Sequence, residues 1–136
     1  MPRFFINCIT AVALLFTVEA RADMVDVNNS ELESLLKQKV TIIDIRRADE
    51  WKETGVVSSS HPITFFDRWG RFDRDDFLQK LSGVANRKSP IILICHSGVR
   101  SRVIGYWLSN AVGFEQVINV SGGIESWIET GHATVP

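Results

Sequence analysis

Apolar and polar positions divide the chain into short segments with two different periodicities. The apolar, largely β-branched runs at residues 40–45, 90–95 and 117–120 predict strands, because they are too short for buried helices. The run at 90–95 is so uniformly apolar that we expect it to lie at the centre of a parallel sheet. A weaker strand is predicted at 63–66, whereas residues 23–29 are predicted to form a polar lead-in.

Helical patterns lie between these strands. The segment Ser30–Glu33 has the residues of a capping box, and Asp73 can cap a later helix with its apolar residues on one side. Further helices are predicted at 48–53, at 100–111 and after the glycine pair Gly122-Gly123. Strands that alternate with helices in this way predict a single α/β domain, with a central parallel sheet and helices on both faces.

Residues 1–22 have the pattern of a secretory signal peptide. Arg3 gives a positive start, Phe4–Val18 is largely apolar, and Ala20-Arg21-Ala22 is a small-x-small cleavage site. The apolar stretch is shorter than the about 20 residues that span a bilayer, so we expect cleavage after Ala22 and no stable membrane insertion. The sequence thus predicts a domain of residues 23–136, exported to a bacterial periplasm.

Composition narrows the classes of protein that fit. The chain has 136 residues, 45% of them hydrophobic, which suits one globular domain. A net charge of −1 gives no reason to expect a nucleic-acid partner. There are two cysteines, too few for a disulfide framework or a zinc site with four thiolate ligands, and cleavage would remove Cys8 and leave Cys95 alone. Three scattered histidines make no metal motif.

The candidate chemistry is concentrated in the segment that follows the central strand. In open α/β sheets, ligand sites lie at the carboxyl ends of the strands. A short loop there, with a glycine inside it and a helix after it, can direct backbone N–H groups inward and attract an anion. The same field favours a thiolate, which is the nucleophilic form of cysteine. The candidate residues are Cys95, His96, Ser97, Gly98, Val99, Arg100 and Ser101.

A cysteine at the end of an apolar strand can also be only a small core residue. Gly98, Arg100 and Ser101 in a strand–loop–helix setting favour the functional interpretation, because they add backbone freedom, a fixed positive charge and a hydroxyl donor. Ser97 offers a second hydroxyl in the same loop.

From about Leu32 to Trp127 the sequence resembles a single rhodanese domain, the sulfurtransferase fold. Four ordered segments carry the resemblance: Asp44-x-Arg46 at a strand end, Glu50-Trp51 followed by Gly55, the active loop Cys95–Arg100, and Gly122-Gly123-Ile124 with Trp127. The chain departs from the family at Val56-Val57, where His-Ile is frequent. It also has His96 where thiosulfate users often carry a basic residue.

The resemblance implies covalent sulfur transfer through Cys95. A small anionic donor such as thiosulfate would leave a persulfide on Cys95, and cyanide or a thiol would then accept the sulfur, with no metal or organic cofactor. Arg100 would either help to bind the anion or hold the loop by pairing with a carboxylate. Asp44 and Arg46 are expected to support the site, Asp44 by bracing nearby amides and Arg46 by pairing with Glu50.

Three alternatives stay open. A cysteine phosphatase or arsenate reductase would use a similar anion cradle, but such phosphatases place five residues between Cys and Arg, whereas this chain has four. A non-catalytic binding or regulatory module is the second alternative, and the retention of Cys95 and Arg100 weighs against it. The third is redox defence by an exported thiol. The domain is expected to be a monomer.

Overall fold

Five short parallel strands form the sheet in the computed structural model, which describes residues 23–136. The predicted leader, with Cys8 and the cleavage site, lies outside the described residues. The strands are β1 (Val25–Val27), β2 (Thr41–Asp44), β3 (His61–Pro62), β4 (Ile91–Ile94) and β5 (Val117–Val120), in the order β1-β5-β4-β2-β3. The expected central strand is therefore confirmed: β4 lies in the middle and pairs with both β2 and β5.

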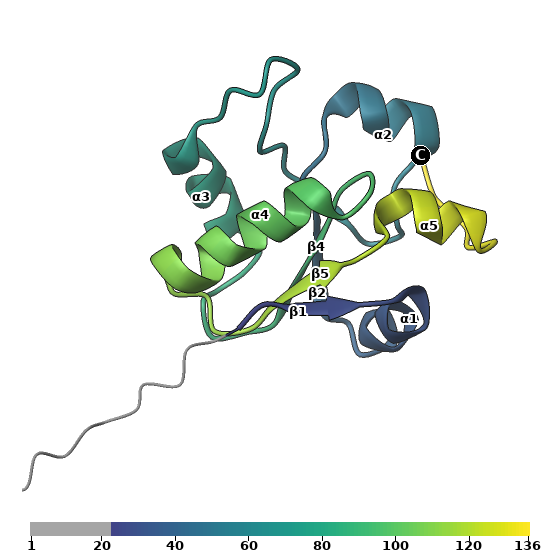
Figure 1. Cartoon of the computed structure of the whole chain (residues 1–136), viewed down its shortest axis with the longest axis horizontal. Helices are drawn as coiled ribbons and strands as arrows, with labels where there is room; N and C mark the ends of the chain where they lie inside the picture. The colour runs from purple at the N-terminus through teal and green to yellow at the C-terminus, as the bar shows by residue number, and fades with distance from the viewer. Residues whose placement is uncertain (1–22) are drawn as a thin grey trace, which may run out of the picture.

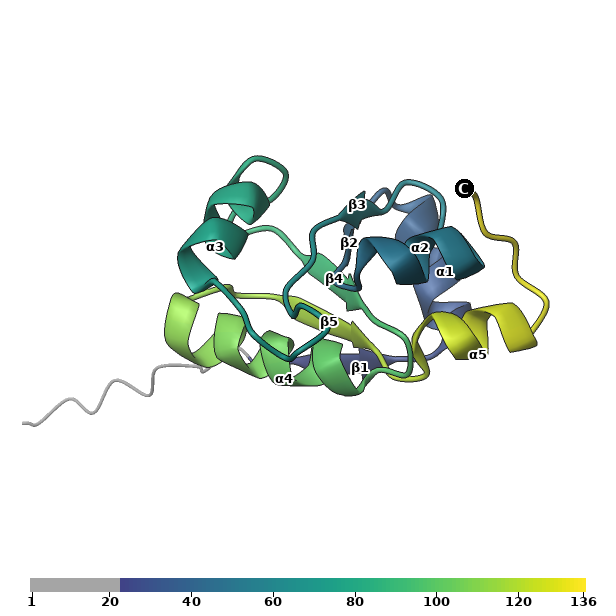
Figure 2. The same ribbon diagram turned by 90° about the horizontal axis from the view of Figure 1, so that it is seen from above.

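Helices cover both faces of this sheet (Figures 1 and 2). Side chains alternate between the two faces along a strand, so Ile91 and Leu93 of β4 point to one core and Ile92 and Ile94 to the other. Helices α3 (Arg74–Ser82) and α4 (Val99–Trp107) pack on the first core, whereas α1 (Asn29–Lys37) and α5 (Gly123–Glu129) pack on the second. The short α2 (Ala48–Thr54) follows β2. The predicted α/β class with a parallel sheet is confirmed.

Two strand predictions were wrong, and both concern the edges of the sheet. Within the polar lead-in predicted at 23–29, residues 25–27 form β1, whose single buried residue, Val27, gives too short a pattern to recognise. The second edge strand is His61–Pro62 rather than 63–66. Proline is tolerated there because an edge strand has no second partner that needs its missing N–H.

Two helix boundaries also differ from the prediction. The capping box of α1 consists of Asn28 and Glu31, whose side chains each accept the other's backbone N–H, rather than Ser30 and Glu33. The helix expected at 100–111 begins at Val99 and ends as one π-helical turn at Leu108–Val112. Within residues 23–136, no helix is long and apolar enough to cross a membrane.

Candidate active site

The loop between β4 and α4 is held in a single tight conformation by two glycines. Gly98 has a φ of +90°, in the left-handed region that favours glycine, and a Cβ there would overlap the carbonyl of Ser121. Gly123, with a φ of +62°, lies against the carbonyl of His96 in the same way. The segment between β5 and α5 is therefore packed directly against the loop.

The first turn of α5 completes this attachment. The N–H of Ile124 donates to the carbonyl of Cys95 (2.9 Å), and the N–H of Glu125 donates to that of His96 (3.1 Å). These bonds fix the backbone just before Gly98. The Gly-Gly-Ile motif predicted to begin a helix thus has a second role, which is to anchor the cysteine loop.

The sulfur of Cys95 lies at the start of α4, where backbone donors converge on it. Cys95 is buried, with 1% of its surface exposed. Its Sγ lies 3.2 Å from the N–H of Gly98, 3.4 Å from the N–H of Ser101 and 3.2 Å from the Ser101 hydroxyl oxygen. Donors at the N-terminus of a helix stabilise negative charge. The arrangement therefore suits an anionic sulfur held at or next to Cys95.

Arg100 holds the loop through an ion pair. Its two terminal nitrogens donate to the two oxygens of Glu50 in α2, at 2.9 and 2.6 Å. Burial alone would raise the pKa of Glu50, but the hydrogen bonds from Arg100 and from the backbone of Arg47 lower that pKa to about 2. The hydrogen bonds to Glu50 also raise the pKa of Arg100. Of the two roles expected for Arg100, the structure thus displays the pairing with a carboxylate.

Asp44 and Arg46 form a second ion pair, which is completely buried. Arg46 donates through Nε to Oδ1 of Asp44 (3.0 Å) and through Nη2 to its Oδ2 (2.8 Å), while Oδ1 also accepts the backbone N–H of Arg46. The expected pairing of Arg46 with Glu50 is therefore wrong, because the carboxylate two residues away captures the guanidinium. Arg46 also donates to Thr54 and to the carbonyl of Gly55, so it fastens the end of α2.

The remaining predicted residues lie at the surface of the loop. His96, Ser97 and Val99 are exposed. The His96 ring lies 3.9 Å from a Glu125 oxygen, with about half of each side chain exposed. Among the described residues, no group of three or more His, Cys, Asp or Glu side chains could hold a metal ion.

Sequence reasoning missed two polar residues behind the sulfur. Asn119 in β5 is completely buried, and its Oδ1 accepts a 2.6 Å hydrogen bond from the hydroxyl of Ser101. Its Nδ2 donates to Oδ1 of Asp26 in β1 (2.8 Å). The one signal in the sequence was an asparagine inside the otherwise apolar run 117–120.

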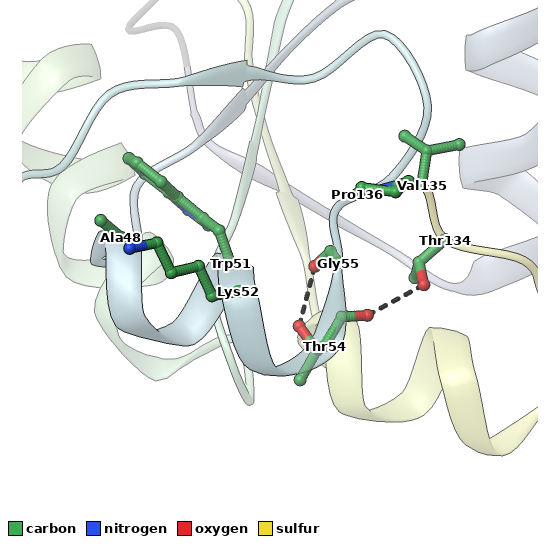
Figure 3. Close-up of a pocket in the computed structure, with 8 residues that line it drawn as sticks. All are labelled: Ala48, Trp51, Lys52, Thr54, Gly55, Thr134, Val135 and Pro136. Atoms are coloured by element: carbon green, nitrogen blue, oxygen red, sulfur yellow. Dashed lines mark hydrogen bonds between the residues drawn. The ribbon is translucent and has the colours of Figure 1, made fainter.

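A hollow of about 580 Å³ lies on another side of α2 (Figure 3). Its lining comes from α2, from Gly55 just after it and from the C-terminal segment 134–136. The surface is mostly apolar, and Lys52 is its one charged lining residue. Its lining holds no cysteine, histidine or carboxylate side chain, so the chemistry of the described residues points to the cysteine loop instead.

Comparison with known proteins agrees with this geometry. A family model described as Rhodanese-like domain matches residues 28–130. The chain is 31% identical over 113 residues to rhodanese-like domain-containing protein 17 of Arabidopsis thaliana, covering 81% of this chain and 70% of that protein. It is 28% identical over 110 residues to thiosulfate sulfurtransferase 18 of the same plant, covering 79% and 80%. The crystal structure of a rhodanese-related protein from Thermoplasma volcanium superposes with a TM-score of 0.62 at 27% identity, covering 82% and 97%.

Proposed function

The chain belongs to the rhodanese-like domain family, and from this membership we propose that it is a sulfurtransferase that works through a persulfide on Cys95. The thiolate of Cys95 attacks the outer sulfur of a small anionic donor such as thiosulfate. The sulfur–sulfur bond of the donor breaks, and sulfite leaves with the electron pair. A thiolate or cyanide then attacks the terminal sulfur of the persulfide, and Cys95 leaves as the thiolate.

The observation that carries this proposal is the convergence of donors on one sulfur. The N–H groups of Gly98 and Ser101 point at Cys95 Sγ from the first turn of α4. Preorganised donors of this kind stabilise negative charge where it appears in a reaction, without any rearrangement at that moment. Cys95 carries that charge as the attacking thiolate and again as the leaving group.

The state of Arg100 favours sulfur transfer over phosphoryl transfer. An arginine that binds a phosphate normally does so through two parallel N–H bonds. Both terminal nitrogens of Arg100 already donate to Glu50, and only four residues separate Cys95 from Arg100. The loop is therefore better matched to a sulfur atom than to a phosphate with four oxygens.

The direct test compares two reactions in the purified domain. We expect thiocyanate to form from thiosulfate and cyanide, no release of nitrophenol from nitrophenyl phosphate, and complete loss of sulfur transfer in Cys95→Ser. Because serine is close in size to cysteine, the variant should keep the circular dichroism spectrum of the parent. Transfer that persists in folded Cys95→Ser would show that another group carries the sulfur.

We propose further that the domain acts after export, in a bacterial periplasm. The support for this is the positive, apolar and small-residue order of residues 1–22. In an oxidising compartment a single cysteine can form no intramolecular disulfide, and Cys95 is the only cysteine after position 22. The buried position of Cys95 limits its exchange with larger disulfides, which would block it as a mixed disulfide.

A further inference from the structure

A chain of buried polar groups runs from Cys95 to the edge of the sheet. Asn119 and Ser101 are both completely buried, and they connect the sulfur to Asp26 at the surface. Buried polar side chains in a core are costly unless each hydrogen bond is satisfied. The hydrogen bonds between these groups therefore constrain where each hydrogen atom lies.

The orientation of the Asn119 amide follows from its neighbours. Its Nδ2 lies 2.8 Å from a carboxylate oxygen of Asp26 and 3.3 Å from the carbonyl oxygen of Gly98. Both of these groups only accept hydrogen bonds, so the NH₂ group must face them. The amide oxygen of Asn119 then faces the hydroxyl of Ser101, which lies 2.6 Å away.

A hydroxyl has one hydrogen, and two acceptors compete for that of Ser101. The Asn119 oxygen at 2.6 Å is closer and a stronger acceptor than the Cys95 sulfur at 3.2 Å. When the hydrogen points to Asn119, the Ser101 oxygen presents a lone pair to the sulfur. That lone pair can accept a bond from a protonated thiol but repels a thiolate.

We propose that Asn119 is a positioning residue that directs the Ser101 hydroxyl away from Cys95 and so favours the protonated thiol. When the thiol ionises, its proton goes to water and the hydroxyl turns, which gives the Cys95 thiolate a third donor. Once a persulfide forms, the charge moves to the terminal sulfur and the hydroxyl returns to Asn119. The persulfide step rests on the proposed function, whereas control of ionisation does not.

The test is the pH profile of Cys95 alkylation by iodoacetamide, which reports the thiolate without any sulfur donor. Asn119→Leu keeps a similar shape and removes the competing acceptor, so the Ser101 hydrogen is free for the sulfur. We expect the midpoint of the profile to fall by about one pH unit, the scale of a hydrogen bond to a charged group. In the Ser101→Ala background, Asn119→Leu should leave the midpoint where Ser101→Ala alone puts it.

Two further variants keep the test decisive. Asp26→Ala removes the nearer of the two acceptors that fix the Asn119 amide, at a partly exposed position, so it is the alternative if Asn119→Leu does not fold. Because the lost negative charge lowers the midpoint in either background, the fall should be larger with Ser101 than in the Ser101→Ala background. An equal fall in both backgrounds would reflect the lost charge alone and would contradict the proposal. Val117→Ala, on the same face of β5, is the matched control, with lower stability and an unchanged midpoint.

The other charged groups around the loop stay constant in the comparison of Asn119→Leu with Ser101→Ala. They are the pairs Arg100–Glu50, Asp44–Arg46 and Arg102–Asp26, and His96 with Glu125. An unchanged or higher midpoint in folded Asn119→Leu, or a fall that does not need Ser101, would overturn the proposal. If the parent protein transfers no sulfur while the variants still shift the alkylation midpoint as expected, the proposed function is refuted but the role of Asn119 is not.

Discussion

Replacing Glu50 by glutamine should loosen the cysteine loop from α2 and make the loss of stability depend on pH. The substitution keeps the shape of the side chain but removes the charge that pairs with Arg100. The Glu50 pKa falls from 4.5 to about 2 on folding. At about 1.4 kcal/mol per pKa unit, this fall of about 2.5 corresponds to at most about 3.5 kcal/mol of stability. Because both side chains keep some contact with water, we expect about 1–3 kcal/mol at neutral pH.

The sign of the pH dependence follows from the lowered pKa. The contribution of Glu50 is complete above its unfolded pKa of 4.5 and disappears as the pH falls towards about 2. The difference in free energy of unfolding between the parent and Glu50→Gln should therefore shrink as the pH falls over that interval. Urea denaturation at a series of pH values measures it.

The matched control is Glu53→Gln, an exposed carboxylate on the same helix, which should change stability by less than about 0.5 kcal/mol. In a double-mutant cycle with Arg100→Gln, the two single losses should not add. The assigned pairing would be refuted if Glu50→Gln and the parent were equally stable at neutral pH. It would also be refuted if their difference in free energy of unfolding stayed constant down to about pH 2.

Three other substitutions or measurements test separate parts of the structure. Gly98→Ala should lower stability by about 1–3 kcal/mol and reduce sulfur transfer, because its Cβ would overlap the carbonyl of Ser121; unchanged melting and activity would contradict the loop geometry. Arg46→Met should cost about 3–5 kcal/mol in urea denaturation, since it leaves the Asp44 carboxylate buried and unpaired; a loss under about 1 kcal/mol would contradict that pairing. Expression of the full chain in a bacterium should give periplasmic protein whose intact mass shows cleavage after Ala22, and an uncleaved cytoplasmic product would refute the export proposal.

The centre of the fold could be predicted from the sequence, because β4 is uniformly apolar and β2 carries two buried isoleucines beside it. Residues 41–44 and 91–94 are covered on both faces, and their composition reflects it. The edges could not be predicted in the same way. β1 has a single buried residue, and both residues of the strand at His61–Pro62 are exposed, so neither strand has a pattern long enough to distinguish it from a loop.

The site residues that could not be predicted are those whose contacts join segments distant in the sequence. Cys95 and its loop stand out as consecutive residues, whereas their partners are distant in the sequence. Glu50 lies fifty residues from Arg100, and its spacing from Arg46 predicts a pairing that does not form because Asp44 holds Arg46. Asn119 could be placed behind the sulfur only once β5 was known to lie beside β4.

The most direct test of the central claim is the intact mass of the purified domain after incubation with thiosulfate and removal of the excess. The account predicts a gain of about 32 Da, the mass of one sulfur atom, located on Cys95 by peptide mapping and lost again on addition of cyanide. Cys95→Ser should show no gain. A parent protein that never acquires this mass, or that gains only the about 16 Da of a sulfenic acid, would contradict sulfur transfer through Cys95.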